Sequence, residues 1–206
     1  MSAWLLALHS STPVLGVAAL NLNDPTASRR VLTRAAGREL TNSLPLAVQD
    51  VLPSAQWSGI TRLAVVTGPG GFTGTRLTVV MARTLAQQLG APLDGISSFA
   101  LMAPRLAAVQ GLDATEDPFW IVQTLPRRGQ VGGRYQIRPN GQVAELQPPH
   151  LLAEGELVTP AVSMVENVEA DVGRLLDLCL EAHRCGSPAP WDVVLPIYPT
   201  SPVGVV

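Results

Sequence analysis

The feature that most constrains this fold is a run of glycines between a buried strand and a long helix. Residues 68–74 read Gly-Pro-Gly-Gly-Phe-Thr-Gly and follow an apolar segment at residues 63–66. A helical pattern then continues to Leu89, and Gly90 is placed to cap it. Because glycine allows sharp turns and close backbone approach, the run predicts a tight strand-to-helix connection in a layered α/β fold.

Strands and helices alternate through the first half of the chain. Apolar runs predict a hairpin, a third strand, a helix, a strand, the long helix, a further strand and a third helix. These elements are expected at residues 4–8, 14–22, 30–36, 38–52, 62–67, 73–89, 92–96 and 98–109. Pro45 either lies in the first turn of the helix within 38–52, which then begins near Ser43, or kinks that helix. Three strands followed by alternating elements predict a mixed sheet, the layout of a ribonuclease H-like or actin-like ATPase lobe.

The second half of the chain predicts a smaller lobe of similar type. A polar stretch at 111–118 suggests a boundary, which gives an N-terminal lobe of residues 1–110 and a reduced C-terminal lobe of residues 111–206. Short strands are expected at 119–125, 131–138, 142–146 and 156–159, with a hairpin turn at 139–141. An amphipathic helix over 168–183 and an extended, proline-rich tail complete the prediction.

Charge and composition exclude several classes of function. All 14 basic residues are arginine, so the chain offers no Schiff-base lysine, Walker-type lysine or kinase-type lysine. The net charge of -2 disfavours autonomous binding of tRNA or DNA. Charged residues make up only 15% of the chain, which suggests either an apolar surface for a partner or simply a low-charge monomer.

The ends of the chain and its two cysteines predict a soluble, cytoplasmic protein with reduced thiols. The opening residues lack the basic region of a signal peptide, and no apolar run approaches the ~20 residues of a membrane span. The three histidines are far apart in sequence, and Cys179 and Cys185 fall at or beyond the end of one helix, so we expect no metal site. We find no arrangement typical of a catalytic site.

Two loops are candidates for binding an anion. The glycine segment, with Gly68, Gly70, Gly71, Thr73, Gly74 and Arg76, precedes a helix N-terminus but matches neither G-x-G-x-x-G nor Walker A. Two roles for this segment stay open: it binds phosphate, or it is a strand-to-helix crossover whose glycines only permit close packing. The polar turn at residues 9–12, His-Ser-Ser-Thr, is favoured as a plain turn over a phosphate site.

The segment 68–77 resembles the Gly-Pro-Gly-Ser-Phe-Thr-Gly-x-Arg motif of the TsaB family, also called YeaZ. The opening Leu-Ala-Leu-His-Ser-Ser-Thr at 6–12 is similar to the family's Leu-Ala-Ile-Asp-Thr-Ser-Thr. Stretches at 38–52, 82–92 and 95–98 follow in the family's order, so the resemblance covers about residues 4–103. Three departures stand out: His9 replaces an aspartate, Leu40 a histidine and Gly71 a serine. Residues 123–127 match the family's Asp-Ala-Arg strand poorly.

The resemblance implies a subunit without chemistry of its own. TsaB proteins are non-catalytic paralogues of TsaD, which transfers threonylcarbamoyl to an adenosine of tRNA, and they help recruit the ATPase TsaE. It implies a TsaD-like partner, a TsaE-like partner or a homodimer, no bound metal, and ATP or ADP, if any, at the partner interface. The expected docking residues on the helices within 38–52 and 73–89 are Leu44, Val48, Val51, Leu77, Met81 and Leu85. Two alternatives are an ATP-dependent kinase or transferase acting alone, and a metallopeptidase.

Overall fold

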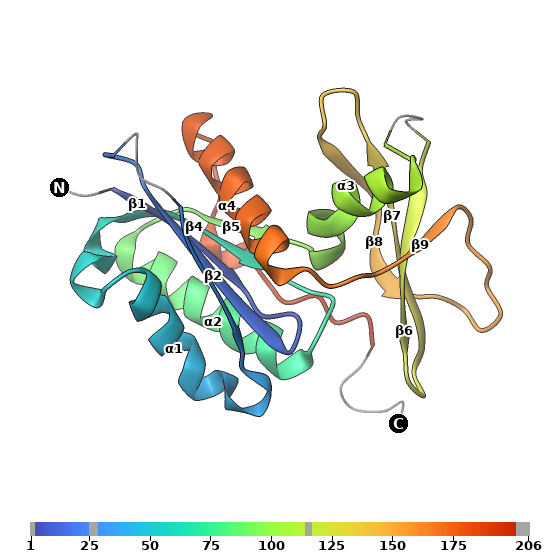
Figure 1. The fold of residues 1–206 in the computed structure, drawn as a ribbon, viewed down its shortest axis with the longest axis horizontal. Coiled ribbons are helices and arrows are strands. Elements are labelled where there is room, and N and C mark those ends of the chain that lie inside the picture. Colours follow the sequence, from blue (N-terminus) through green and yellow to red (C-terminus); the bar gives the residue numbers. More distant parts are fainter. Residues whose placement is uncertain (1–2, 25–28, 114–116, 201–206) are drawn as a thin grey trace. The chain divides into compact units, whose positions relative to one another are not determined.

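The computed structural model describes residues 3–24, 29–113 and 117–200. The chain forms two compact units (Figure 1). The first comprises Met1–Ile96 and Asn167–Pro196, and the second comprises Ser97–Glu166 and Ile197–Val206. This division differs from the expected boundary after residue 110, since the third helix groups with the second unit and the last helix with the first. The expected boundary segment and the tail include residues 114–116 and 201–206, which lie outside the described residues.

The first unit is built on a five-stranded mixed sheet in the order β3-β2-β1-β4-β5. The first three strands are antiparallel, and β4 and β5 continue the sheet parallel to β1. This confirms the mixed sheet predicted from the order of elements. The strands are β1 (Trp4–His9), β2 (Val14–Asn21), β3 (Arg30–Ala35), β4 (Ile60–Val66) and β5 (Leu93–Ile96).

Helices cover both faces of the first sheet. Helices α1 (Leu40–Val51) and α2 (Phe72–Leu89) lie on one side, and α4 (Val168–Arg184) lies on the other (Figure 1). The central strands β1 and β4 are therefore apolar on both faces, as parallel strands between two layers need to be. On the α4 side Gly16 is essential to the packing, because a Cβ there would lie 2.7 Å from a methyl group of Val168.

The ends of the helices follow local sequence signals. Gly90 adopts a φ of 62° and caps α2, as predicted. Helix α1 begins at Leu40 and keeps Pro45 inside it, so of the two alternatives for Pro45 the one with a start near Ser43 is wrong. A 3-10 turn at Gly37–Glu39 leads into α1 and supplies the earlier start. Between α1 and β4, a second 3-10 helix spans Ser54–Gly59.

The second unit contains a four-stranded sheet in the order β8-β7-β6-β9. Its pairings, two antiparallel and one parallel, repeat the order of the first four strands of the first unit. Helix α3 (Ser98–Gln110) packs on β7, β8 and β9, and its Ser97 cap accepts a hydrogen bond from the Ala100 N–H at 3.0 Å. The strands are β6 (Phe119–Leu125), β7 (Gly129–Ile137), β8 (Val143–Leu151) and β9 (Ala161–Ser163).

The last strand lies later than the sequence predicts. Residues 156–159 form no strand, because Gly155 turns the chain with a φ of 78° and pairing with β6 begins only at Ala161. The chain then enters α4, capped by Asn167, and a short 3-10 helix at Trp191–Val193 follows in the tail. Among the described helices, none is both long and apolar enough to span a membrane.

Candidate functional site

The glycine segment packs directly against the turn between β1 and β2. The N–H of Gly71 donates to the carbonyl of Ser11 at 2.8 Å. A Cβ at Gly70 would lie 2.0 Å from that same carbonyl oxygen, well inside van der Waals contact. Gly68 has a φ of 99°, which favours glycine. Gly70 is therefore needed so that two backbone segments can touch, and Gly68 for its backbone conformation.

The start of α2 continues this contact. A Cβ at Gly74 would lie 2.5 Å from the carbonyl oxygen of Ser10 and 3.1 Å from a methyl group of Leu40. The Ser10 hydroxyl donates to the Gly74 carbonyl at 2.8 Å and also shares a hydrogen bond with the hydroxyl of Thr78. Helix α2 is thus fixed to the first loop by backbone contact and by a buried serine.

The hydroxyls of the first loop are used within the chain. Besides Ser10, Thr12 donates to the Val14 carbonyl at 2.9 Å and accepts from the Val14 N–H at 3.1 Å. The hydroxyls of Ser10 and Thr12 thus stabilise the turn itself and the start of α2. Gly70, Gly71, Thr73 and Arg76 remain exposed at the rim of the segment. The geometry accounts for the glycines by close packing, and a nucleotide contact at the rim stays a prediction.

The expected docking residues divide into two groups. Leu44, Val48 and Val51 are buried, with exposed fractions of 1%, 0% and 4%, so the expectation that they contact a partner is wrong. They face the sheet because the apolar stripe of α1 packs inward on β2 and β3. The three α2 residues of the expected set, Leu77, Met81 and Leu85, are half-buried and pack against the edge of this core.

Other residues form the outer surface of the same two helices. Leu46 of α1 is 55% exposed and Val80 of α2 is 52% exposed. Sequence periodicity groups such residues with the buried ones, because apolar side chains occur on more than one side of each helix. We call Leu46, Leu77, Val80, Met81 and Leu85 the outer helix surface.

Within the described ranges, no three His, Cys, Asp or Glu side chains gather closely enough to hold a metal ion. His9 is buried at the end of β1, with an exposed fraction of 1%. Cys179 is buried in α4 and Cys185 is exposed, and both are free thiols. Burial raises the pKa of the Cys179 thiol to about 12, and the nearby carboxylate of Asp94 adds to this effect.

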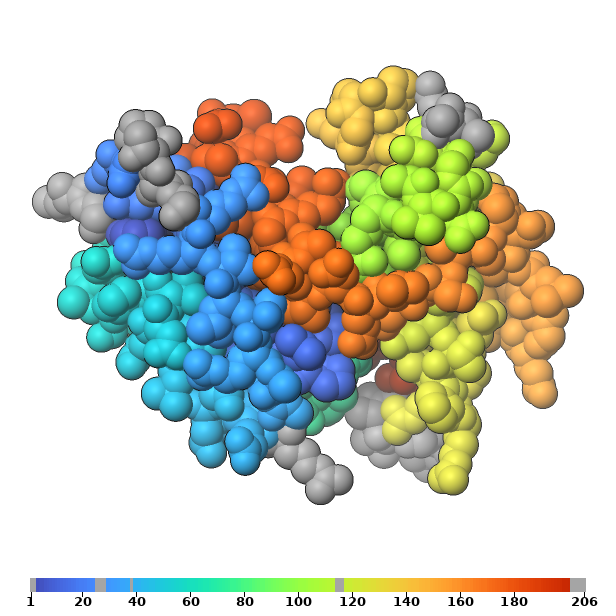
Figure 2. Space-filling view, viewed as in Figure 1, coloured from blue at the N-terminus to red at the C-terminus, as the bar shows by residue number. Residues whose placement is uncertain are grey.

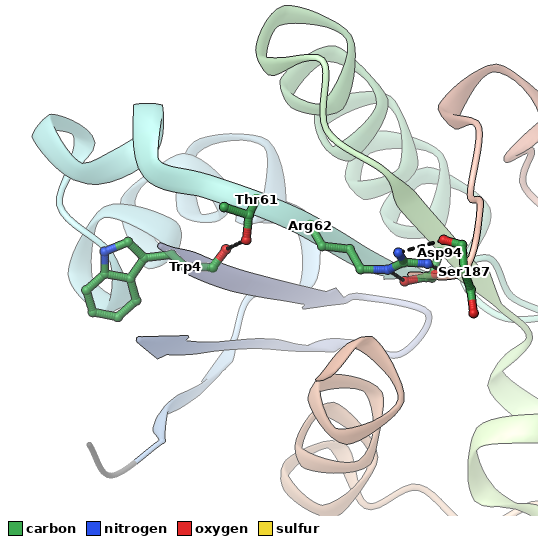
Figure 3. A network of polar contacts seen from close by, with 5 residues as sticks. All are labelled: Trp4, Thr61, Arg62, Asp94 and Ser187. Carbon is green, nitrogen blue, oxygen red and sulfur yellow. Dashed lines mark hydrogen bonds and ion pairs between the residues drawn. The ribbon is translucent and has the colours of Figure 1, made fainter. Parts of the chain in front are cut away.

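A buried ion pair in the first unit was not found by sequence reasoning. Arg62 of β4 binds Asp94 of β5 through Nε at 2.6 Å and through a second nitrogen at 2.7 Å, and also donates to the carbonyl of Ser187 at 2.8 Å (Figure 3). Hydrogen bonding to Asp94 raises the pKa of Arg62, which is only 2% exposed. The sequence did contain a signal for this pair: each of the two apolar strands carries one charged residue, and the two charges have opposite signs.

A second polar cluster lies under α3 in the second unit. The hydroxyl of Tyr135 donates to a carboxylate oxygen of Glu145 at 3.1 Å, and Ser97 donates to the same oxygen at 3.1 Å. Burial raises the pKa of Tyr135, so this side chain stays a neutral donor. The cluster joins β7, β8 and the start of α3.

Fold and site together define a class of protein: an actin-like α/β protein whose first loop is closed by a packed glycine segment. Residues 26–133 match the family model of TsaD, described as tRNA N6-adenosine threonylcarbamoyltransferase. The curated tRNA threonylcarbamoyladenosine biosynthesis protein TsaB of Bacillus subtilis (strain 168) is 30% identical over 147 residues, which are 70% of this chain and 59% of that protein. The chain belongs to the TsaD family, and within it is similar to the TsaB (YeaZ) proteins.

Two solved structures from Pseudomonas aeruginosa show the same fold. One is described as an uncharacterized protein with similarity to peptidase YEAZ, with a TM-score of 0.72 and 23% identity over 96% of this chain and 100% of that one. The other is YeaZ, with a TM-score of 0.71 and 22% identity over 95% of this chain and 100% of that one. The likeness extends over both units.

Proposed function

We propose that this chain is a non-catalytic scaffold subunit in the biosynthesis of tRNA threonylcarbamoyladenosine. In this role it binds and activates a TsaD-like catalytic subunit and helps recruit a TsaE-like ATPase. The family match and the name of the Bacillus relative support the pathway. The observation that carries the scaffold role is the contact of Gly70 and Gly74 with the carbonyls of Ser11 and Ser10. The N–H of Gly71, a donor that an open glycine loop could offer to a phosphate, is already bonded to the Ser11 carbonyl.

The outer helix surface supports the partner role. Leu46 and Val80 expose apolar side chains on α1 and α2, beside the half-buried Leu77, Met81 and Leu85. Burying such a surface in a complex is favourable by about 25 cal/mol per Å² of apolar area. The same surface fits either a TsaD-like partner or a second copy of this chain, and we propose the heterodimer as the functional form.

Substitution of Val80 by arginine tests this assignment. Val80→Arg places a charge on the outer helix surface. It should therefore raise the dissociation constant of the complex with the cognate TsaD-like protein at least about 10-fold. Val109→Arg is the matched control, because Val109 is an 80% exposed valine on α3 in the second unit. Size-exclusion chromatography with light scattering follows the complex and also detects a homodimer of the chain alone.

The result contradicts the proposal if Val80→Arg binds the partner as the unchanged chain does, or if only Val109→Arg loses binding. Circular dichroism of both variants checks that they fold. A variant of Val80 that unfolds would place this residue in the core, and Leu46→Arg then repeats the test on α1.

A nucleotide, if one takes part, is proposed to bind only with the partner present. Gly71, Thr73 and Arg76 remain exposed at the rim of the glycine segment. Calorimetric titration with Mg-ATP should therefore give no heat with the chain alone and heat only in the mixture with the TsaD-like protein. Heat with the chain alone would favour the kinase or transferase alternative.

A further inference from the structure

The second sheet has one face that no described helix of its unit covers. Helix α3 packs on the other face of the sheet (Figure 1). There it belongs to one apolar cluster with the alternate side chains Phe119, Ile121 and Tyr135. Neighbouring residues on a strand point to opposite faces, so Trp120 and Arg134 lie on the uncovered face. We call this the open face of the second sheet. In the first unit, by contrast, helices cover both faces of the sheet.

The open face combines an aromatic ring with groups that form hydrogen bonds. Trp120 of β6 is directly opposite Arg134 of β7, which in turn is opposite Gln147 of β8. The Trp120 and His150 rings meet edge to face, with their centroids 6.0 Å apart. Trp120 and His150 are half-buried, so parts of both rings are accessible to a ligand.

None of the four described strands places a carboxylate on this face. Glu145 is the only acidic residue in β6, β7, β8 and β9, and it is on the α3 side, where it accepts hydrogen bonds from Ser97 and Tyr135. The side chain of Arg134 makes no ion pair or hydrogen bond with the described residues, and its Nε is buried without a partner. An arginine in this state is suited to bind an anion.

The hairpin that carries Trp120 and Arg134 ends in two more arginines. Arg127 and Arg128 form its tip between β6 and β7, are exposed, and make no ion pair within the described part of the chain. Arg127 has a φ of 63°, uncommon for a residue other than glycine. The hairpin, yellow in Figure 2, reaches the surface of its unit.

We propose that the open face of the second sheet binds single-stranded RNA. An unpaired base would stack on Trp120, Arg134 would hold an adjacent phosphate, and Gln147 would donate to or accept from the edge of the base. Arg127 and Arg128 would hold phosphates further along the strand. A sheet face whose strands contribute an aromatic ring, an arginine and an amide, but no acidic side chain, complements a single strand, whose bases and charges are both accessible.

The choice of RNA rests on the function proposed above, because the substrate of that pathway is a tRNA. The binding is expected to be weak in the isolated chain, since the net charge of -2 supplies no general attraction for nucleic acid. The open face thus adds contacts for a strand that a partner also holds. The isolated chain is therefore expected to bind RNA weakly, and measurably only at low salt.

Fluorescence anisotropy of a labelled single-stranded RNA oligonucleotide, titrated with the full chain at low salt, tests the proposal. Trp120→Ala should weaken binding about 10-fold, the effect of losing one stacked base, and Trp120→Phe should restore most of it. Arg134→Ala should make the plot of log association constant against log salt concentration less steep by about 0.7, the value for one phosphate contact on a single strand. Arg184→Ala, an exposed arginine at the end of α4 in the first unit, is the matched control and should change neither quantity.

Several outcomes overturn the proposal. They are no RNA binding by the unchanged chain, equal loss with Arg184→Ala, equal affinity for duplex and single-stranded RNA, or unchanged binding by both Trp120→Ala and Arg134→Ala. Loss of binding to the TsaD-like partner with Trp120→Ala, while RNA binding is retained, would identify the open face as a protein interface instead. Because the RNA titration uses this chain alone, its failure is distinct from a failure of the scaffold role, which the Val80→Arg experiment tests.

Discussion

At the scale of single residues, we predict opposite changes in stability when two helical glycines are each replaced by alanine. Gly74→Ala should lower the free energy of unfolding by about 2 kcal/mol or more, because its Cβ would lie 2.5 Å from the Ser10 carbonyl oxygen. Gly173→Ala, in the interior of α4, meets no atom within 4 Å and should raise the stability by up to about 1 kcal/mol. Urea unfolding followed by circular dichroism measures both changes. A Gly74→Ala variant as stable as the unchanged chain would mean that the glycine segment does not pack tightly on the first loop.

The glycine segment 68–74 shows how much of the role of single residues could be predicted from the sequence. The run at 68–74 predicted a turn with close backbone approach, and the contact of Gly70 with Ser11 is such an approach. Nothing in the sequence says which segment lies opposite, because that segment is about 60 residues away and is brought near only by the pairing of β1 with β4. Phosphate binding and close packing therefore remained alternatives until the geometry was known.

At the scale of elements, the Arg62–Asp94 pair joins β4 to β5 and to the segment after α4. Asp94→Asn leaves a buried guanidinium without its carboxylate and should lower the free energy of unfolding by about 3 kcal/mol or more. Asp50→Asn is the control, because its pair with Arg34 has side chains 51% and 39% exposed and should contribute less than about 1 kcal/mol. Equal effects in urea unfolding would show that Arg62 finds other partners.

Periodicity located most of the elements, and its failures have a common cause. Strand β6 and helices α2 and α4 were predicted closely, since each carries an uninterrupted pattern of its own. Strand β9 was placed too early, because three residues are too few for a pattern and only pairing with β6 defines them. Likewise, the apolar rows of α1 could not be divided into Leu44, which is buried, and Leu46, which is exposed, before the sheet was in place.

At the scale of the whole molecule, the two sheets repeat one order of strands but differ in how they are covered. In the first unit, α1 and α2 cover one face and α4 covers the other, and Leu46 and Val80 are exposed on the outer sides of α1 and α2. In the second unit, α3 covers only one face, and the other carries Trp120 and Arg134. The sequence shows that both units contain strands in this order, but whether a face is covered depends on which unit each helix joins, as α4 illustrates.

The absence of lysine gives this molecule a simple alkaline titration, in which Cys179 should be visible. The folded thiol has a pKa of about 12, and an unfolded one has a pKa of about 8.5, so between pH 8.5 and 10 the unfolded chain releases a proton that the folded chain keeps. The folded state then binds more protons, and the free energy of unfolding should fall as the pH rises, by up to about 1.4 kcal/mol per pH unit.

Unfolding by urea at several pH values under reducing conditions measures this slope. Cys179→Ala should flatten it, whereas Cys185→Ala, which removes an exposed thiol, should keep it. An unchanged slope in Cys179→Ala would mean that the buried thiol does not govern alkaline stability, and since the chain has no lysine, Tyr135, whose pKa is also raised by burial, would then be the group responsible.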